Sequence, residues 1–290
     1  MFETIVVATD LSEASDSVIA CLHGLRDLGA RKVVLAHSVG VKYEEEIAHL
    51  LSQMAESKLA SQRAVIEAQG FQVTVEIGSG TPMVEVNRIA KEHGASLIVV
   101  GSLGATMARE VLLGGVALAI LYRAEIPVLI VRLRVAEPGA AEKCRVVCSD
   151  FTKHVLFTTD FSDNAERAFE QVKQIVANGA HRVTLLHVQD KAKIDLHLTH
   201  RLEEFNRIDQ ERLERLKDEL TRQGGADVTM RIPYGSPTQE ILKLSAEDQD
   251  TLIVMGSQGR GFISEVFLGS VSHNVARHAT VPVLIVPPLI

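Results

Sequence analysis

The stretch Thr9-Asp10-Leu11-Ser12 follows a short apolar run and returns as Thr159-Asp160-Phe161-Ser162 after a second one. A glycine tetrad, Gly101-Ser-Leu-Gly104, likewise returns as Gly256-Ser-Gln-Gly259. The offset is 150 residues from Asp10 to Asp160 and 155 from Gly101 to Gly256, so five residues are inserted within the second copy. Solenoid repeats run only about 20–50 residues. We therefore predict one domain fold that occurs twice.

Length and composition support two globular domains. The chain has 290 residues, 46 % hydrophobic and 23 % charged, with a net charge of −7. That balance provides no basic surface for a nucleic-acid backbone. The apolar run near Met1 is too short for a signal-peptide core or a membrane span. We expect a cytoplasmic protein that binds neither nucleic acid nor membrane.

Apolar runs alternate with helical segments in both copies. Such runs indicate strands buried on both faces, and the helices between them imply right-handed crossovers. Ser12 is predicted to cap the first helix, and Pro82 to lie in the first turn of another. The fold class is therefore predicted to be α/β, with two tandem, doubly wound, five-stranded parallel-sheet domains. The predicted strands are 4–8, 32–37, 72–77, 97–100 and 127–131, and then 154–158, 183–187, 228–232, 252–255 and 283–286.

Two long helices are predicted from their patterns. The first covers about residues 44–69, with a buried stripe of Ile47, Leu50, Leu51, Met54 and Val65. The second covers Lys191 to Arg222 and mixes charges of both signs, which is typical of an amphipathic helix with a solvated face.

A glycine loop follows the fourth strand of the second copy. Gly256, Gly259 and Gly269-Ser270 form a G-x2-G-x9-G-Ser pattern that leads into a helix. Glycines permit positive φ and close backbone approach, and a helix N-terminus presents unpaired N–H groups to an anion. The pattern predicts a phosphate site to which Ser270, Ser272 and Arg260 add donors and charge. The alternative is a simple turn with an ordinary N-cap, and the spacing matches neither the dinucleotide fingerprint nor a P-loop.

The glycine pattern, the segment from Thr158 to Ser162, the strand ending at His187-Val188 and the closing run Val281 to Val286 together resemble the universal stress protein family. The resemblance implies an adenine nucleotide alpha hydrolase-like fold that binds ATP, ADP or AMP, with Mg²⁺ or Mn²⁺ accompanying the nucleotide. By the same resemblance, Asp160 and Val188 contact the nucleoside, while the loop glycines and Ser270 hold the phosphates.

The first copy keeps the glycine spacing but lacks several polar groups. Gly115, Ala117, Ala105 and Ser38 stand where the second copy has Ser270, Ser272, Arg260 and Val188, so we expect the first copy to bind more weakly. The complete set of candidate binding residues is Thr158, Thr159, Asp160, Val188, Met255, Gly256, Ser257, Gly259, Arg260, Gly269, Ser270, Val271 and Ser272, with Thr9, Asp10, Ser38, Gly101, Gly104, Gly114 and Gly115 in the first copy.

Domain boundaries and assembly follow from the repeat and the resemblance. Domains are predicted at 1–135 and 153–290, with a linker at 136–152. The last strands, 128–131 and 283–286, would each leave an unpaired apolar edge, which is an association hazard. We expect the two edges to pack as an intramolecular pseudo-dimer, and a homodimer of such tandems remains open.

Other polar residues admit two interpretations. His37 and His187 either serve as catalytic bases or anchor the sheet edge by hydrogen bonds. His197, His200 and Asp195 could chelate a metal but fit a solvated helix face better. Cys144 and Cys148 are spaced like a redox clip or half of a zinc site, and otherwise are spare thiols.

Three functions fit these features. The leading one is a nucleotide-binding stress-response module without strong catalysis, because no set of catalytic acid, base and nucleophile is visible. The second is a slow ATPase or autophosphorylating enzyme with Ser270 or Ser272 as the acceptor. The third is a scaffold that works without nucleotide.

Overall fold

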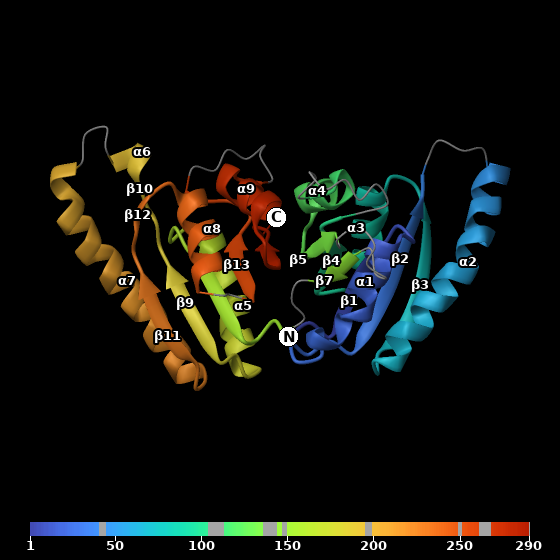
Figure 1. Cartoon of the computed structure of the whole chain (residues 1–290), viewed down its shortest axis with the longest axis horizontal. Helices are drawn as coiled ribbons and strands as arrows, with labels where there is room; N and C mark the ends of the chain where they lie inside the picture. Colours follow the sequence, from blue (N-terminus) through green and yellow to red (C-terminus); the bar gives the residue numbers. More distant parts are fainter. Residues whose placement is uncertain are drawn as a thin grey trace. The chain divides into compact units, whose positions relative to one another are not determined.

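The computed structural model describes residues 1–40, 45–103, 113–135, 144–146, 150–194, 199–248, 251–260 and 268–289. Two compact units, Met1–Ser149 and Asp150–Ile290, divide the chain, and each is described by itself. Unit 1 is the blue-to-green part of Figure 1 and unit 2 the yellow-green-to-red part. Of the predicted linker, only 144–146 and 150–152 lie within the described residues, so Cys148 lies outside them.

Unit 1 is a five-stranded parallel sheet with the order β5-β4-β1-β2-β3. An antiparallel pair, β6 and β7, follows it, and this pair was not predicted. Its elements are β1 (Thr4–Thr9), α1 (Glu13–Ala20), a 3₁₀ turn (Leu22–Leu25), β2 (Lys32–Val39), α2 (Glu45–Ala68), β3 (Gln72–Ser79), α3 (Pro82–Glu92), β4 (Leu97–Gly101), α4 (Gly115–Arg123), β5 (Val128–Val131), β6 (Leu133–Val135) and β7 (Cys144–Val146).

Unit 2 repeats this order as β14-β13-β8-β9-β11, again parallel throughout. A short parallel pair, β10 and β12, is added beside it. Its elements are β8 (His154–Thr158), α5 (Asp163–Ala177), β9 (Arg182–Leu186), β10 (Gln189–Asp190), α6 (Lys191–Ile194), a 3₁₀ turn (Thr199–Arg201), α7 (Leu202–Gln223), β11 (Asp227–Arg231), β12 (Tyr234–Gly235), α8 (Pro237–Glu247), β13 (Leu252–Gly256), α9 (Ser270–His278) and β14 (Val283–Val286).

Both sheets are doubly wound, as predicted. In unit 1, α1 packs with α2 and α3 with α4, and in unit 2, α5 packs with α7 and α8 with α9. The first strand of each unit lies inside its sheet, with the second and fourth strands as neighbours. The strand order therefore reverses there, which opens a crevice at the carboxyl ends of the strands.

The predicted helix starts are confirmed where side chains cap them. Ser12 accepts a hydrogen bond from Ser15 N, and Ser162 accepts one from Ala165 N. Pro82 occupies the first turn of α3. These local signals fix where α1, α5 and α3 begin, because each satisfies or removes an N–H that the helix itself cannot pair.

The predicted buried stripe of α2 is wrong in part. Met54 is 68 % exposed and Val65 44 %, whereas Ala55, Leu59 and Ile66 are buried. Met54 and Val65 each precede a buried residue by one position, which turns them about 100° round the helix. The remaining stripe residues, Ile47, Leu50 and Leu51, have side chains outside the described set.

The single helix predicted from Lys191 to Arg222 is also wrong, because α6 ends at Ile194 and α7 begins at Leu202. Asp195 and His197 lie outside the described residues.

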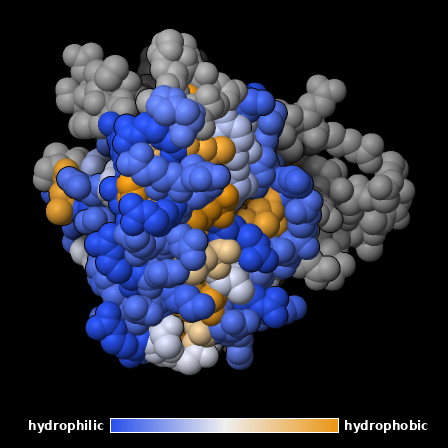
Figure 2. Space-filling model, turned by 90° about the vertical axis from the view of Figure 1, so that its left-hand side faces the viewer, coloured by the Kyte–Doolittle hydropathy of each residue, from blue (hydrophilic) through white to orange (hydrophobic). Residues whose placement is uncertain are grey.

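Helix α7 buries one face, on which Leu213 and Leu220 are fully buried. The opposite face of α7 is charged, and Figure 2 shows that this side of the molecule is largely hydrophilic. Within the described residues, no helix combines the length and apolarity that crossing a membrane requires.

The α2 register gives a first prediction. Leu59 is 1 % exposed, so Leu59→Ala should lower the free energy of unfolding by about 2–5 kcal/mol through lost burial and a cavity. Met54→Ala on the same helix should change it by less than about 0.5 kcal/mol. Urea unfolding of both variants measures this, and equal losses would contradict the register.

Candidate functional site

A cavity of about 710 Å³ lies beyond the carboxyl ends of β8, β9 and β13 in unit 2. Every second-copy candidate residue except Ser257 lines it. Ser257 is 2 % exposed and lies behind the loop, where its Oγ contacts Asn164 Oδ1 at 3.4 Å. The structure therefore brings together, around one hollow, residues that the sequence places a hundred positions apart.

The Thr-Asp-x-Ser segment builds the turn at the end of β8. Phe161 has a left-handed φ of 58°, which is costly for a residue with a side chain. Thr159 Oγ1 accepts from Phe161 N at 2.9 Å, and Asp160 Oδ1 accepts from Ser162 N at 3.1 Å and from Ser162 Oγ at 2.6 Å. Short polar side chains thus hold a strained turn, which explains why the same residue types occur in both copies.

Asp160 also joins this turn to the glycine loop. Its Oδ2 accepts a hydrogen bond from Arg260 N at 2.7 Å. A Cβ at Gly259 would lie 2.5 Å from the same oxygen, closer than real contacts allow. A side chain at Gly259 would therefore have to displace this carboxylate from its hydrogen bond with Arg260 N.

The sequence-based reason for the loop glycines needs correction. Positive φ was expected to be part of their use, but Gly256, Gly259 and Gly269 are not among the residues with positive φ. Close approach is the actual reason, since a Cβ at Gly256 would lie 2.8 Å from Asn164 Oδ1. The N–H of Gly269 donates to Ser257 O at 2.7 Å, so it is not free for a phosphate as predicted.

Asn164 is a functional residue that the sequence reasoning missed. From the first turn of α5, its Nδ2 donates to Val286 O at 3.0 Å, and its Oδ1 accepts from Gln258 N at 2.8 Å. It thereby ties the glycine loop to the end of β14. Comparison of the two copies could have indicated Asn164, because the first copy has Ala14, which lacks an amide, at the equivalent position.

The N-terminus of α9 faces the cavity without a side-chain cap. Gly269 is the N-cap residue, as the ordinary N-cap of the alternative interpretation has it, and no side-chain hydrogen bond caps the helix. Ser270, Val271 and Ser272 form the first turn and line the cavity. Ser272 Oγ donates to Gly256 O at 2.9 Å, so its hydroxyl proton is used within the protein. No earlier carbonyl of the helix pairs the N–H groups of this turn, which is the arrangement that binds anions at helix N-termini.

A polar cluster from β9, β10 and α7 forms the opposite part of the cavity wall. His187 Nδ1 lies 2.8 Å from Thr159 O, and its Nε2 lies 3.3 Å from Asp209 Oδ2. Gln189 Nε2 also donates to Asp209 Oδ2, at 3.3 Å, while Arg212 Nη1 lies 3.5 Å from Oδ1. Burial alone would raise the pKa of Asp209, but its contacts with His187, Gln189 and Arg212 outweigh burial and hold that pKa below its usual value.

The two histidines at equivalent positions of the repeat, His37 and His187, act alike toward the sheet. His37 Nδ1 lies 3.0 Å from Thr9 O, which matches the contact between His187 and Thr159. Each ring therefore links the second strand to the end of the first, and this is the anchoring role weighed from the sequence. The cavity residues that the sequence did not indicate, many of them apolar, are Ala165, Leu186, Gln189, Asp190, Lys193, Ile194, Phe205, Ile208, Asp209, Arg212, Pro237, Ile241 and Gln258.

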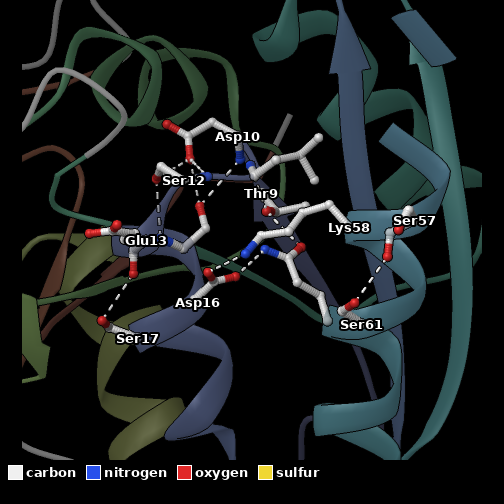
Figure 3. A network of polar contacts seen from close by, with 12 residues as sticks. Thr9, Asp10, Ser12, Glu13, Asp16, Ser17, Ser57, Lys58 and Ser61 are labelled. Atoms are coloured by element: carbon white, nitrogen blue, oxygen red, sulfur yellow. Dashed lines mark hydrogen bonds and ion pairs between the residues drawn. The ribbon is translucent and has the colours of Figure 1, made fainter. Parts of the chain in front are cut away.

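In unit 1 a polar network joins side chains near the end of β1 (Figure 3). Thr9 Oγ1 donates to Gln62 Oε1 at 3.0 Å, and Gln62 Nε2 donates to Asp16 Oδ1 at 2.8 Å. Lys58 Nζ pairs with Asp16 Oδ2 at 2.5 Å. Helix α2 is thus joined directly to the end of β1 and to α1.

The remaining first-copy candidates are mostly engaged within unit 1. Asp10 Oδ1 accepts from Ser12 and, at 2.7 Å, from Ser15 Oγ, which has no counterpart at Ala165. Ser38 Oγ donates to Gly80 O, and Gly114 N donates to Ser102 O. Gly101 ends β4 and Gly115 begins α4, while Gly104 lies outside the described residues.

Comparison with known proteins identifies relatives of both halves. The model of the universal stress protein family matches residues 1–132 and 152–287. Universal stress protein MJ0577 of Methanocaldococcus jannaschii is 35 % identical over 153 residues, which cover 46 % of this chain and 94 % of that protein. A universal stress protein from Archaeoglobus fulgidus is 27 % identical, with a TM-score of 0.74, over 99 % of this chain and 98 % of that one. Protein PA1789 of Pseudomonas aeruginosa, 14 % identical with a TM-score of 0.62 over 99 % and 93 % of the two chains, shares the fold.

The crowded space at Gly259 gives a second prediction. Gly259→Ala should push Asp160 away from Arg260 N and lower the free energy of unfolding by about 1–3 kcal/mol. Gly225→Ala is the matched control in the same unit, because nothing lies within 4 Å of its added Cβ. Chemical denaturation compares them, and equal stability of the two variants would refute the steric requirement.

The lowered pKa of Asp209 predicts a pH dependence. A carboxylate with a folded-state pKa below its unfolded value of about 3.9 stabilises the native state above that value, and the contribution is lost as the pH falls through the folded-state pKa. The unfolding free energy of Asp209→Asn should therefore fall less than that of the wild type between about pH 5 and pH 2. Glu203→Gln, at an exposed position of α7, should follow the wild type. Parallel wild-type and Asp209→Asn curves would be the contrary result.

Proposed function

Since this chain belongs to the universal stress protein family, we propose that unit 2 binds an adenine nucleotide, ATP, ADP or AMP, in the cavity beyond β8, β9 and β13. The observation that carries the proposal is the first turn of α9, which has no side-chain cap and lines the cavity. The polar cluster of His187, Gln189 and Asp209 lines the same cavity. An anion site and an apolar-walled hollow lie side by side, which suits a ligand with phosphates at one end and a flat ring at the other.

The phosphate donors under this proposal are few and specific. Within the described glycine loop, Ser257 N pairs with Val286 O, Gln258 N with Asn164 and Arg260 N with Asp160. Donors remain at Gly259 N and at the first turn of α9. Ser270 adds a hydroxyl and Arg260 a positive charge at the cavity wall. Charge-assisted bonds of this kind contribute about 1.5–3 kcal/mol each.

The role we propose is binding rather than catalysis. Asp160 accepts protein donors at both carboxylate oxygens, and His187 has a partner at each ring nitrogen. Neither group is poised to take a proton from a nucleophile. Mg²⁺ or Mn²⁺ would accompany the nucleotide on its phosphates. In the cell, we propose, a partner reads nucleotide occupancy during a stress response in the cytoplasm. The pseudo-dimer through the last strands remains a prediction.

The alternative of a slow ATPase or autophosphorylating enzyme is favoured by Ser270, whose position at the α9 N-terminus would place its hydroxyl beside a phosphate. Incubation of the purified chain with γ-labelled ATP separates the two functions. Stoichiometric retention with neither label transfer nor phosphate release supports the binding module. Label on the protein, or steady release of phosphate, supports the enzyme.

Exchanging one residue at the helix start between the two copies tests the proposed phosphate donor. Ser270→Gly, which installs the first-copy residue, should weaken ATP binding by about tenfold or more, because one hydroxyl donor to a charged phosphate is lost. Gly115→Ser at the start of α4 has open space for its side chain and should leave the tight site unchanged. Calorimetric titration of the full chain measures both, and an unaltered affinity of Ser270→Gly would oppose the assignment.

A further inference from the structure

Two arginines from distant segments of unit 2 meet on one aromatic ring. Arg212 of α7 has its Cζ 5.1 Å from the centre of the Phe161 ring, and Arg260 of the glycine loop has its Cζ 5.8 Å from the same centre. Both separations lie within the range in which an aromatic ring attracts a guanidinium group. Phe161 follows β8, which lies between β9 and β13. The ring therefore gathers one cation from the segments after β9 and one from the loop after β13.

Both guanidinium groups are accessible to a ligand. Arg212 and Arg260 line the cavity, the Arg212 side chain is 38 % exposed, and Arg260 is exposed. Because both distances run to one ring centre, the two Cζ atoms lie at most about 11 Å apart. Arginine binds phosphate through pairs of hydrogen bonds of about 2.8 Å, and its long side chain rotates freely at the surface. One phosphate group between the two arginines can therefore contact both.

The positive charge of this pair is only partly balanced by acidic groups. Within the part of the chain that the structure describes, the Arg260 guanidinium makes no ion pair, since Asp160 accepts from the backbone N of Arg260 instead. Arg212 Nη1 lies 3.5 Å from Asp209 Oδ1. Two like charges that share one ring repel each other, and an anion between them removes that repulsion. The pair is therefore suited to a group that carries more than one negative charge.

We propose that Arg212 and Arg260 together bind the terminal phosphate of the nucleotide, so that unit 2 binds a nucleoside triphosphate more tightly than the monophosphate. This inference rests on the proposed nucleotide binding in the same cavity. A phosphate chain that begins at the first turn of α9 and passes Gly259 N meets Arg260 next, because Arg260 follows Gly259 in the loop. Phe161 does not line the cavity, so it is a positioning residue that holds both arginines.

Unit 1 lacks the aromatic ring and one of the two cations. Leu11 stands at the position of Phe161, and Ala105 stands at that of Arg260. The position of the other cation follows from the two long helices, whose buried residues match at one constant offset. These residues are Ala55, Leu59 and Ile66 in α2, and Asp209, Leu213 and Leu220 in α7.

The remaining cation is already paired in unit 1. At the same offset, Lys58 of α2 corresponds to Arg212 of α7. Lys58 Nζ lies 2.5 Å from Asp16 Oδ2, within the network at the end of β1. Two arginines on one ring are therefore a feature of unit 2 and not of the repeated fold. This fits a role in ligand binding better than a role in folding.

The test is calorimetric titration of the full chain with ATP and with AMP. The wild type should bind ATP at least about tenfold more tightly than AMP. Arg212→Gln should weaken ATP binding by about tenfold and change AMP binding by less than about twofold, because AMP has no phosphate that reaches Arg212. Arg212→Lys keeps the charge and should retain more of the preference. Phe161→Leu, which installs the unit 1 residue, should lower the preference in the same direction.

The matched control is Arg215→Gln, one turn further along α7. Arg215 is exposed, does not line the cavity and donates to Glu211 O of its own helix, so this variant should keep the wild-type preference. Equal weakening of ATP and AMP in Arg212→Gln, no weakening of either, or a wild type that binds both equally overturns the role of the arginine pair and leaves the proposed function standing. A wild type that binds neither nucleotide overturns both.

Discussion

The carboxylate of Asp160 is the contact on which the rest of the site depends. One oxygen holds the turn after β8 through Ser162, and the other holds the glycine loop through Arg260 N. The two segments are a hundred residues apart, and this single group joins them. A side chain at Gly259 would displace this carboxylate. Asp160, which the sequence suggests as a nucleotide-binding residue, therefore also has a structural role, because it connects two segments of the protein.

The two units show how one scaffold supports different interiors. The sheets share their strand order, and both turns after the first strand have a left-handed residue, Leu11 or Phe161. The buried polar groups near the carboxyl end of the first strand differ. Unit 1 has the Thr9–Gln62–Asp16–Lys58 network there, whereas unit 2 has a cavity lined by the buried Gln189 and Asp209. One scaffold thus carries different polar groups in its two copies.

Much of the fold could be predicted because its signals are local or periodic. Apolar runs, with alternation at 72–77, marked all ten main strands to within about two residues. Ser12 and Pro82 marked helix starts, since each acts on its own backbone neighbours. The α2 stripe failed in part because Met54 and Val65 are apolar but lie one position off the buried face. The break between α6 and α7 was missed because mixed-charge sequence is compatible with helix on either side of it.

The sequence by itself determined the repeat, the parallel α/β fold, the family and the loop that borders the cavity, because these depend on patterns within short segments. Only the tertiary structure decided which N–H groups of the glycine loop are already paired and that Asn164 ties this loop to β14. Hydrogen-bond satisfaction is a property of atoms brought together from distant segments, and a linear pattern cannot show which donors and acceptors folding has already paired.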